Sequence, residues 1–206
     1  MLRRLLGLVL RPIWLLLIRA VPEGDPWERV DSAPRLYLYG SGARLDFGRV
    51  LHGESRVTVT SLDDIQGWLL QCRYESDQVL FAEEDFWQHP VTFEHLRAGD
   101  CEDFALWAWR KMIELDFDAD LVTGYCLTDG ELAGRHAWVV FRRDGSEYVF
   151  EPADRDRARM VQPLATVRDR YLPQFGVDRR GRRFTFTGYL TAEKRRLAAR
   201  SRRDGR

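Results

Sequence analysis

The clearest periodic pattern in the chain runs from Cys101 to about Leu115, where apolar residues recur every three or four positions. This spacing predicts an amphipathic helix, with Arg110, Lys111 and Glu114 facing outward. The apolar stripe consists of Cys101, Phe104, Ala105, Ala108, Met112 and Leu115. Upstream, Ser61 followed by Asp64 predicts a capped helix that continues to about Gln71.

Alternating and apolar runs after residue 117 predict strands. They cover residues 118–128, a run that begins at His136, and a run that ends at Glu151, with an Asp144-Gly145 turn between the last two. A final strand is expected over 183–190, and short strands over 36–39 and 57–60. A helix followed by antiparallel strands predicts the α+β class.

Changes in composition along the chain predict three parts. Residues 1–34 form an apolar, basic N-terminal segment and a linker rich in Pro, Gly and acids, and residues 35–190 form the folded domain. Residues 191–206 form a basic helix or tail, with Thr191 as its cap. At 206 residues, 45% hydrophobic and with a net charge of zero, the chain fits one ordinary globular domain. We expect it to be a monomer.

Two basic regions bear on the partners of the protein. The C-terminal region is rich in arginine, but no aromatic residue is interleaved past Tyr189, so nucleic acid is not expected as a partner. Residues 1–20 carry Arg3, Arg4, Arg11 and Arg19 among apolar residues, a pattern that resembles a signal or a membrane anchor. Arg11-Pro12 interrupts the apolar run, so a packed helix remains an alternative. Membrane association through this segment, or a location in the cell envelope, is favoured over the cytoplasm.

The three cysteines differ in their settings. An odd number without paired spacing argues against a disulfide framework or a cysteine-rich zinc site. Cys72 and Cys126 lie in apolar runs and are expected to be buried, whereas Cys101 opens a helix among polar residues. A helix N-terminus and a nearby imidazolium both favour the thiolate. Cys101, His136 and a following acid are therefore the parts of an activated cysteine nucleophile.

Two acids compete for the third position, Glu151 and Asp154. If Asp144-Gly145 forms a two-residue primed turn, Arg143 pairs with Ser146 and Glu151 falls on the same face as His136. A three-residue loop would shift the register by one and favour Asp154. We take Glu151 as the acid that orients His136, with Asp154 as the alternative.

With these residues in view, the chain resembles the bacterial transglutaminase-like cysteine proteinases, a branch of the papain-like superfamily. The resemblance covers roughly residues 60–155 and includes Phe86-Trp87, Pro90, Phe93 and the Cys101-centred run 99–105. It implies a papain-like core, in which a helix with the catalytic Cys packs on an antiparallel sheet with the His and the acid. It also implies cleavage or transfer at amide bonds of a protein or peptide substrate. The usual acid in this family is Asp, and Glu151 departs from that pattern.

Further expectations follow from the resemblance and its neighbouring residues. No cofactor is required, but some relatives hold calcium with acids that flank the cysteine, here Asp100 and Glu102. Two carboxylates alone are a poor site, since calcium prefers six to eight oxygens. Trp87 and Gln88 are candidates for an oxyanion hole beside the Cys101 N–H. The alternatives are a cell-wall peptide hydrolase, which usually has Ser-Gly after the cysteine, and a non-catalytic domain that binds a protein or membrane.

Overall fold

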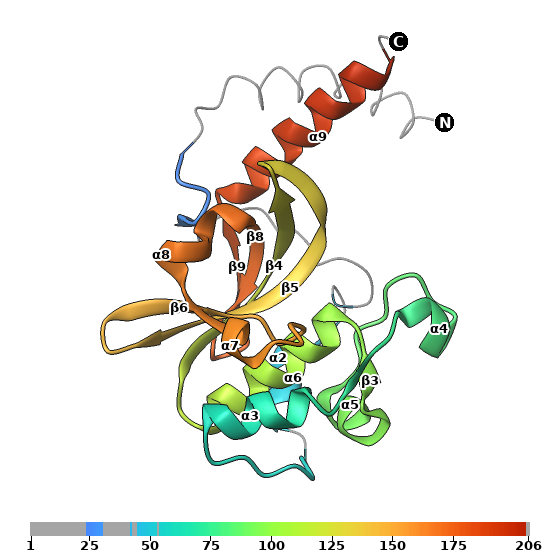
Figure 1. Ribbon diagram of the computed structural model, residues 1–206, viewed down its shortest axis with the longest axis vertical. Coiled ribbons are helices and arrows are strands. Elements are labelled where there is room, and N and C mark those ends of the chain that lie inside the picture. Colours follow the sequence, from blue (N-terminus) through green and yellow to red (C-terminus); the bar gives the residue numbers. More distant parts are fainter. Residues whose placement is uncertain (1–23, 31–41, 43–44, 53, 205–206) are drawn as a thin grey trace.

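One antiparallel sheet of seven strands organises the computed structural model, which describes residues 24–30, 42, 45–52 and 54–204 (Figure 1). The strand order is β1-β9-β8-β4-β5-β6-β7. The strands are β1 (Arg29–Val30), β4 (Asp118–Thr128), β5 (Glu131–Arg143), β6 (Ser146–Phe150), β7 (Val161–Pro163), β8 (Tyr171–Val177) and β9 (Arg183–Phe186). The long β4–β5 pair forms the curved centre of the sheet.

Helix α6 (Cys101–Glu114) packs on one face of this sheet and contributes more residues to the main core than any other element. Around it lie α2 (Phe47–His52), α3 (Leu62–Leu69), α4 (Asp77–Phe81) and α5 (Pro90–Leu96). A small parallel ladder of β2 (Arg73–Tyr74) and β3 (Ala98–Gly99) leads the chain into α6. Apolar residues at 137, 139 and 141 of β5 face this core, as period-two alternation requires.

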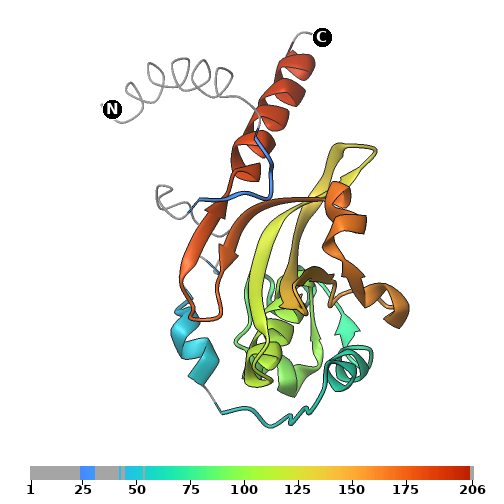
Figure 2. The same ribbon diagram turned by 90° about the vertical axis from the view of Figure 1, so that its left-hand side faces the viewer.

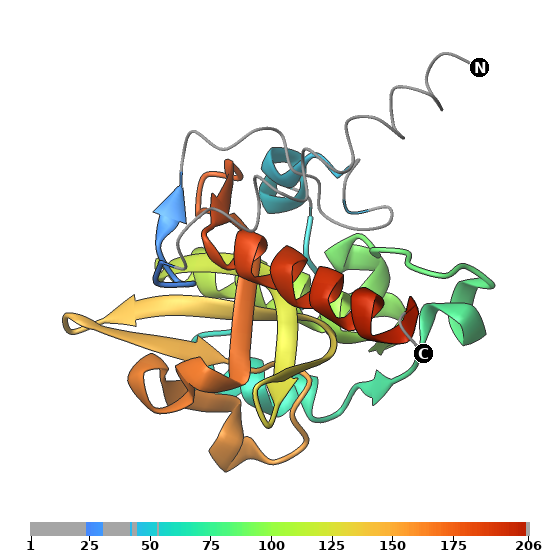
Figure 3. The same cartoon turned by 90° about the horizontal axis from the view of Figure 1, so that it is seen from above.

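The opposite face of the sheet buries a second apolar cluster that includes Val122, Trp138, Val140 and Val149. Two short elements border it, α8 (Leu164–Val167) and the 3-10 turn Arg168–Arg170, whereas Met160 of α7 (Arg157–Met160) belongs to the main core. The C-terminal α9 (Gly188–Asp204) starts at the sheet and projects beyond it (Figure 2). Seen from above, α9 crosses the end of the β4 and β8 strands (Figure 3).

Local patterns predicted the elements around the cysteine correctly. The structure confirms the helix at Cys101–Glu114, the strand Asp118–Thr128 and the α+β arrangement of a helix on an antiparallel sheet. The Ser61 side chain accepts a hydrogen bond from the Asp64 N–H, so the predicted cap of α3 is also confirmed. The two-residue turn is confirmed as well, since Arg143 pairs with Ser146.

Other expectations were wrong. Residues 57–60 form no strand, and α9 begins at Gly188, so the last strand ends four residues before the expected Leu190. Strand β8 was not expected, although all seven of its residues are buried. Residues 29–30 of the predicted linker pair with β9, because Trp27 packs on Trp138 and Phe186 and draws this segment onto the sheet.

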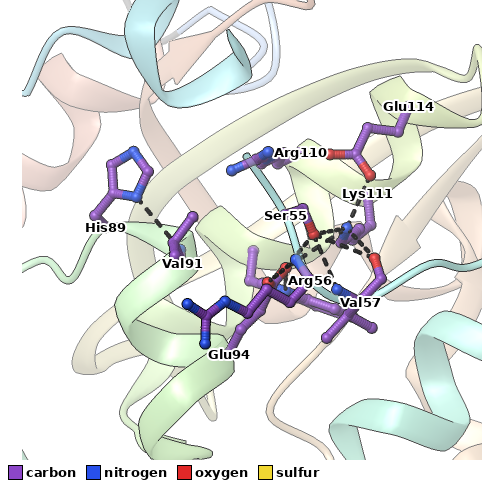
Figure 4. Close-up of polar contacts among 10 residues, drawn as sticks. Ser55, Arg56, Val57, His89, Val91, Glu94, Arg110, Lys111 and Glu114 are labelled. Atoms are coloured by element: carbon purple, nitrogen blue, oxygen red, sulfur yellow. Dashed lines mark hydrogen bonds and ion pairs between the residues drawn. The ribbon is translucent and has the colours of Figure 1, made fainter. Parts of the chain in front are cut away.

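The outward orientation predicted for Arg110 and Lys111 was also wrong. Both side chains are buried, because α5 and the segment before α3 cover this side of α6. The ammonium group of Lys111 donates to the Ser55 hydroxyl, to the Val57 carbonyl at 2.5 Å and to Glu114 at 2.8 Å, and it lies 3.5 Å from the Glu94 carboxylate (Figure 4). These contacts compensate the buried charge of Lys111, which the helical pattern alone had predicted to be exposed to solvent.

The remaining predictions for the N-terminal region, which concern residues 1–23 and the strand 36–39, lie outside the described residues. Within the described ranges, no helix combines the length and the apolar character needed to span a membrane.

Candidate active site

Cys101 is the first residue of α6, and one residue, Asp100, separates the helix from β3. Asp100 is the N-cap residue, and its backbone N–H points to the Asp103 carboxylate at 3.4 Å. The Cys101 thiol donates to Oε2 of Glu102 at 3.2 Å, and its sulfur accepts the backbone N–H of Ala137 from β5. Strand β6 pairs with β5 only from Val139 onward, which leaves this edge of β5 open to the helix end.

The side chains of Asp103 and Gln88 lie against Gly99, just before α6 begins. A Cβ atom at this position would overlap the Asp103 carboxylate and the Gln88 amide. These two side chains are hydrogen-bonded to each other, and Asp103 also accepts the Gln88 backbone N–H at 2.7 Å. Residue 99 therefore has to be glycine for the loop at 85–88 to close over the start of the helix.

His136 on β5 and Glu151, which follows β6, are in direct contact. The Nε2 atom of His136 lies 2.7 Å from Oε2 of Glu151, just past the end of β6. An ionised carboxylate only accepts, so Nε2 carries the proton and Nδ1 is the basic nitrogen in the neutral ring. The Tyr171 hydroxyl donates to the same Oε2 at 3.1 Å. The expected pairing of His136 and Glu151 thus agrees with the geometry.

Asp154 lies in a different set of contacts. Its carboxylate accepts from the Arg159 guanidinium at 3.0 Å and from the Asp156 backbone N–H at 2.8 Å. These bonds hold the turn before α7, so the geometry favours Glu151 over Asp154 as the partner of His136.

Cys101 and His136 line one open cavity of about 590 Å³. Its other walls come from the loop before α5, from β2 and from the open edge of β5. The remaining lining residues include Tyr74, Asp85, Trp87, Glu102 and Arg135. The thiol, the imidazole and a space for a substrate are therefore contiguous.

Burial is the main influence on the pKa of the Cys101 thiol. It raises the pKa of the Cys101 thiol well above the ordinary value, and the charges of Glu102 and Asp100 raise it further, while the Ala137 N–H acts in the opposite direction. Burial also raises the pKa of Cys72 and of Cys126 to about 12. All three thiols are free of disulfides. A thiolate at Cys101 therefore needs both a base and relief from the nearby negative charge.

A cluster of carboxylates surrounds the start of α6. Two groups of three carboxylates, Asp77/Asp100/Asp103 and Asp77/Asp85/Glu102, place oxygens within 4.8 Å of one another, and Asp100 and Glu102 form a third such group with the Cys101 sulfur. Burial raises the pKa of Glu102 to about 10 and that of Asp103 to about 8, with further increases from neighbouring acids. Within the described ranges, the buried Oδ1 atoms of Asp77 and Asp100 have no hydrogen-bond partner. Such unpartnered oxygens fit a hard cation.

The two residues expected near an oxyanion differ in position. Trp87 lines the cavity, but its indole N–H donates to Asp85 at 3.1 Å. Gln88 is buried behind the cavity wall, and its amide donates to the Ala98 carbonyl at 3.0 Å and to Asp103. Gln88 thus supports the helix start, and both donors are already engaged in this structure.

Sequence reasoning missed Asp77, Asp85, Tyr74 and Tyr171. The first three precede the cysteine by 16 to 27 positions on short or irregular elements, with no periodic pattern to relate them to Cys101. Tyr171 opens the unexpected strand β8. The mostly apolar run from 171 to 177 is the sequence signal for this strand. Pro173 argues against a strand there, because proline cannot donate a hydrogen bond to a neighbouring strand.

A larger cavity, of about 920 Å³, lies on the opposite face of the sheet, against Trp27, Phe184 and Leu164. Its arginines Arg142 and Arg168 bind the carboxylates of Asp120 and Asp25. It contains neither cysteine nor histidine, so its size does not make it the centre of the chemistry.

Comparison with known proteins gave structural similarities alone. No family model matches the sequence, and no curated protein matches it. Legionella pneumophila LapG is 18% identical, with 84% of each chain covered and a TM-score of 0.47. Calcium-bound LapG is 20% identical over 68% of this chain and 77% of that chain, with a TM-score of 0.44. A Bacillus cereus arylamine N-acetyltransferase, described as having a Cys-His-Glu catalytic triad, is 20% identical over 52% of this chain and 48% of that chain, with a TM-score of 0.36. At these TM-scores the functional conclusions depend on the side chains of this protein.

Proposed function

We propose that this protein is a thiol-dependent hydrolase or acyl transferase that acts on peptide or isopeptide bonds of a protein or peptide substrate. Cys101 is the nucleophile, His136 the general base and acid, and Glu151 the residue that orients His136. The observation that carries the proposal is the 2.7 Å contact between His136 and Glu151 at a cavity that Cys101 shares. This contact leaves Nδ1 of His136 as the basic nitrogen.

The proposed reaction has two halves. The Cys101 sulfur attacks the substrate carbonyl carbon while Nδ1 of His136 takes the thiol proton, and the tetrahedral intermediate collapses as His136 protonates the leaving amine. Water or a second amine then attacks the thioester, with His136 as base, and the thiol is regenerated. The start of α6 favours the developing oxyanion, because its backbone N–H groups point out of the helix end.

We also propose that a calcium ion is held by Asp77, Asp85, Asp100 and Glu102. Asp77, Asp85 and Glu102 place oxygens within 4.8 Å of one another, and Asp100 lies within the same distance of Asp77 and of Glu102. Their carboxylates offer the oxygens that calcium prefers, and Asp77 and Asp100 have the unpartnered atoms described above. When bound, the cation would offset the negative charge that raises the pKa of Cys101. Asp103 is excluded from the set, because its oxygens hold Gln88 and the Asp100 N–H.

One observation favours a second function. The raised pKa of the Cys101 thiol would suit a non-catalytic domain that keeps the helix-and-sheet arrangement and binds a protein partner. The two functions differ in the reactivity of a single sulfur atom, which makes them separable.

A peptidyl vinyl sulfone, which forms a thioether with an activated cysteine, tests the proposal. With calcium present, we expect the adduct on Cys101 in the wild type and in the Cys72→Ala and Cys126→Ala variants. Cys101→Ala and His136→Ala should give no adduct. Absence of the adduct from wild-type Cys101, across a panel of peptide sequences, would support the non-catalytic function. Hydroxylamine added with a cleaved peptide traps the thioester as a hydroxamate, and the ratio of hydroxamate to free acid measures how well an amine competes with water.

A further inference from the structure

The carboxylate of Glu151 has a second donor besides His136, and this donor belongs to a buried residue. The Tyr171 hydroxyl lies 3.1 Å from Oε2, the same oxygen that is 2.7 Å from Nε2 of His136. We infer that Tyr171 is a positioning residue, which holds Glu151 and through it His136 for the proposed chemistry. The inference rests on the proposed function of Cys101, His136 and Glu151.

The two carboxylate oxygens of Glu151 differ in the hydrogen bonds that they accept. Oε2 receives both the His136 and the Tyr171 contacts, whereas among the described residues Oε1 has one contact, from the Ala153 N–H at 3.4 Å. A carboxylate oxygen presents its lone pairs in fixed directions, so two donors on one oxygen define the plane of the group. Without the hydroxyl, Glu151 would be held on its Oε2 side by His136 alone. A residue that must orient the imidazole would then itself depend on the imidazole for its orientation.

The aromatic ring of Tyr171 adds a second restraint. It lies nearly parallel to the His136 ring, with 20° between the planes and 6.5 Å between the centroids. Trp138 is also nearly parallel to His136, at 24° and 6.1 Å, and the Trp138 and Tyr171 rings are 4.9 Å apart. Both aromatic residues are buried. The imidazole therefore adjoins a rigid aromatic pair, and the hydroxyl acts on it only through Glu151.

This arrangement has a consequence for the imidazole tautomer. With Oε2 fixed as an acceptor, the proton of neutral His136 stays on Nε2 and leaves Nδ1 as the base. In Tyr171→Phe the ring remains but the hydroxyl is lost, so Glu151 can turn away and both tautomers become populated. We expect the Nδ1–H form to appear and the rate of Cys101 alkylation by iodoacetamide at pH 7 to fall by about tenfold.

The tautomer can be measured without knowledge of the substrate. The chain has four histidines, so ¹⁵N spectra of histidine-labelled protein can be assigned, with His136→Ala to identify the peak. Calcium is kept present throughout. Tyr148→Phe is the matched control, because Tyr148 packs on Phe141 and its strand ends before Glu151. We expect wild type and Tyr148→Phe to show the Nε2–H form, and Tyr171→Phe to show a mixture.

The outcomes separate this inference from the proposed function. If Tyr171→Phe keeps the wild-type tautomer and alkylation rate while Glu151→Gln loses them, the positioning role is wrong and the triad stands. If His136→Ala leaves the alkylation rate of Cys101 unchanged, the proposed function itself is wrong. If Tyr171→Phe does not fold, a measurement on the wild-type protein still tests the inference. The inference requires that the Tyr171 hydroxyl proton exchanges slowly with solvent and shows a nuclear Overhauser cross-peak to the Nε2 proton of His136. Rapid exchange of the hydroxyl proton would contradict the inference.

Discussion

The Nε2 atom of His136 is 2.7 Å from Oε2 of Glu151, although the two residues are 15 positions apart on consecutive strands. The two-residue Asp144-Gly145 turn accounts for this contact, because both residues adopt positive φ and the ladder then starts at Arg143 and Ser146. Regular pairing ends at Val139 and Phe150, so Glu151 leaves the ladder just where it can reach His136.

The first prediction concerns the identity of the orienting acid. Glu151→Gln should reduce turnover, or the rate of Cys101 adduct formation, by as much as about 10⁴-fold, because the correct tautomer of His136 is lost. Glu151→Asp should have a smaller effect, since it keeps the carboxylate. Asp154→Asn should be close to wild type, because Asp154 binds Arg159 instead. A larger effect for Asp154→Asn than for Glu151→Gln would reverse the assignment.

The second prediction concerns calcium. Millimolar calcium should raise the melting temperature of the protein by several degrees, because a ligand that binds only the folded state stabilises it. EGTA should reverse the shift, and the double variant Asp77→Asn/Asp100→Asn should not show it. Asp144→Asn, an exposed turn residue, is the matched control. The calcium proposal is wrong if the double variant responds to calcium as the wild type does.

The third prediction concerns the buried ammonium group on α6. Lys111→Met should lower the free energy of unfolding by about 3–5 kcal/mol, because it leaves the buried Glu94 carboxylate without its cation. Arg180→Met, at an exposed turn between β8 and β9, is the control and should change stability by less than about 0.5 kcal/mol. Urea denaturation provides the measurement. Equal effects of the two substitutions would show that the network contributes little.

The same network predicts a dependence of stability on pH. Burial alone would raise the pKa of Glu94, but hydrogen bonds from Ser55, Arg56 and Trp107 and the charge of Lys111 hold it below the ordinary value. A carboxyl group with a lowered pKa in the folded state stabilises the protein above its unfolded pKa of about 4.3. This stability is lost as the pH falls through the lower, folded-state pKa.

Urea unfolding between pH 3 and pH 7 measures that dependence. The free energy of unfolding should fall below about pH 4.3, and it should fall less steeply in Glu94→Gln, which cannot titrate. Glu147→Gln, on the more exposed β6, is the comparison and should retain the wild-type slope. Parallel curves for wild type and Glu94→Gln would remove Glu94 from the explanation.

Short-range patterns predicted the positions of the proposed catalytic residues. The stripe from Cys101 to Met112 and the turn at Asp144-Gly145 depend on neighbours within a few residues, and such patterns are visible in a sequence. The burial of Lys111 and the approach of Asp77 to Asp100 depend on how separate segments pack. Tyr171 was missed for the same reason, because its contact with Glu151 follows from the place of β8 beside β4.

The central claim is that Cys101 is a nucleophile activated by His136. Its most direct test is the rate of iodoacetamide alkylation at each of the three cysteines, followed by peptide mass spectrometry at neutral pH with calcium present. Burial raises the pKa of all three thiols, but of the three only Cys101 shares a cavity with His136. We therefore predict that Cys101 reacts fastest and that His136→Ala abolishes its advantage over Cys72 and Cys126. Equal rates at all three cysteines, or a Cys101 rate unchanged by His136→Ala, would contradict the claim.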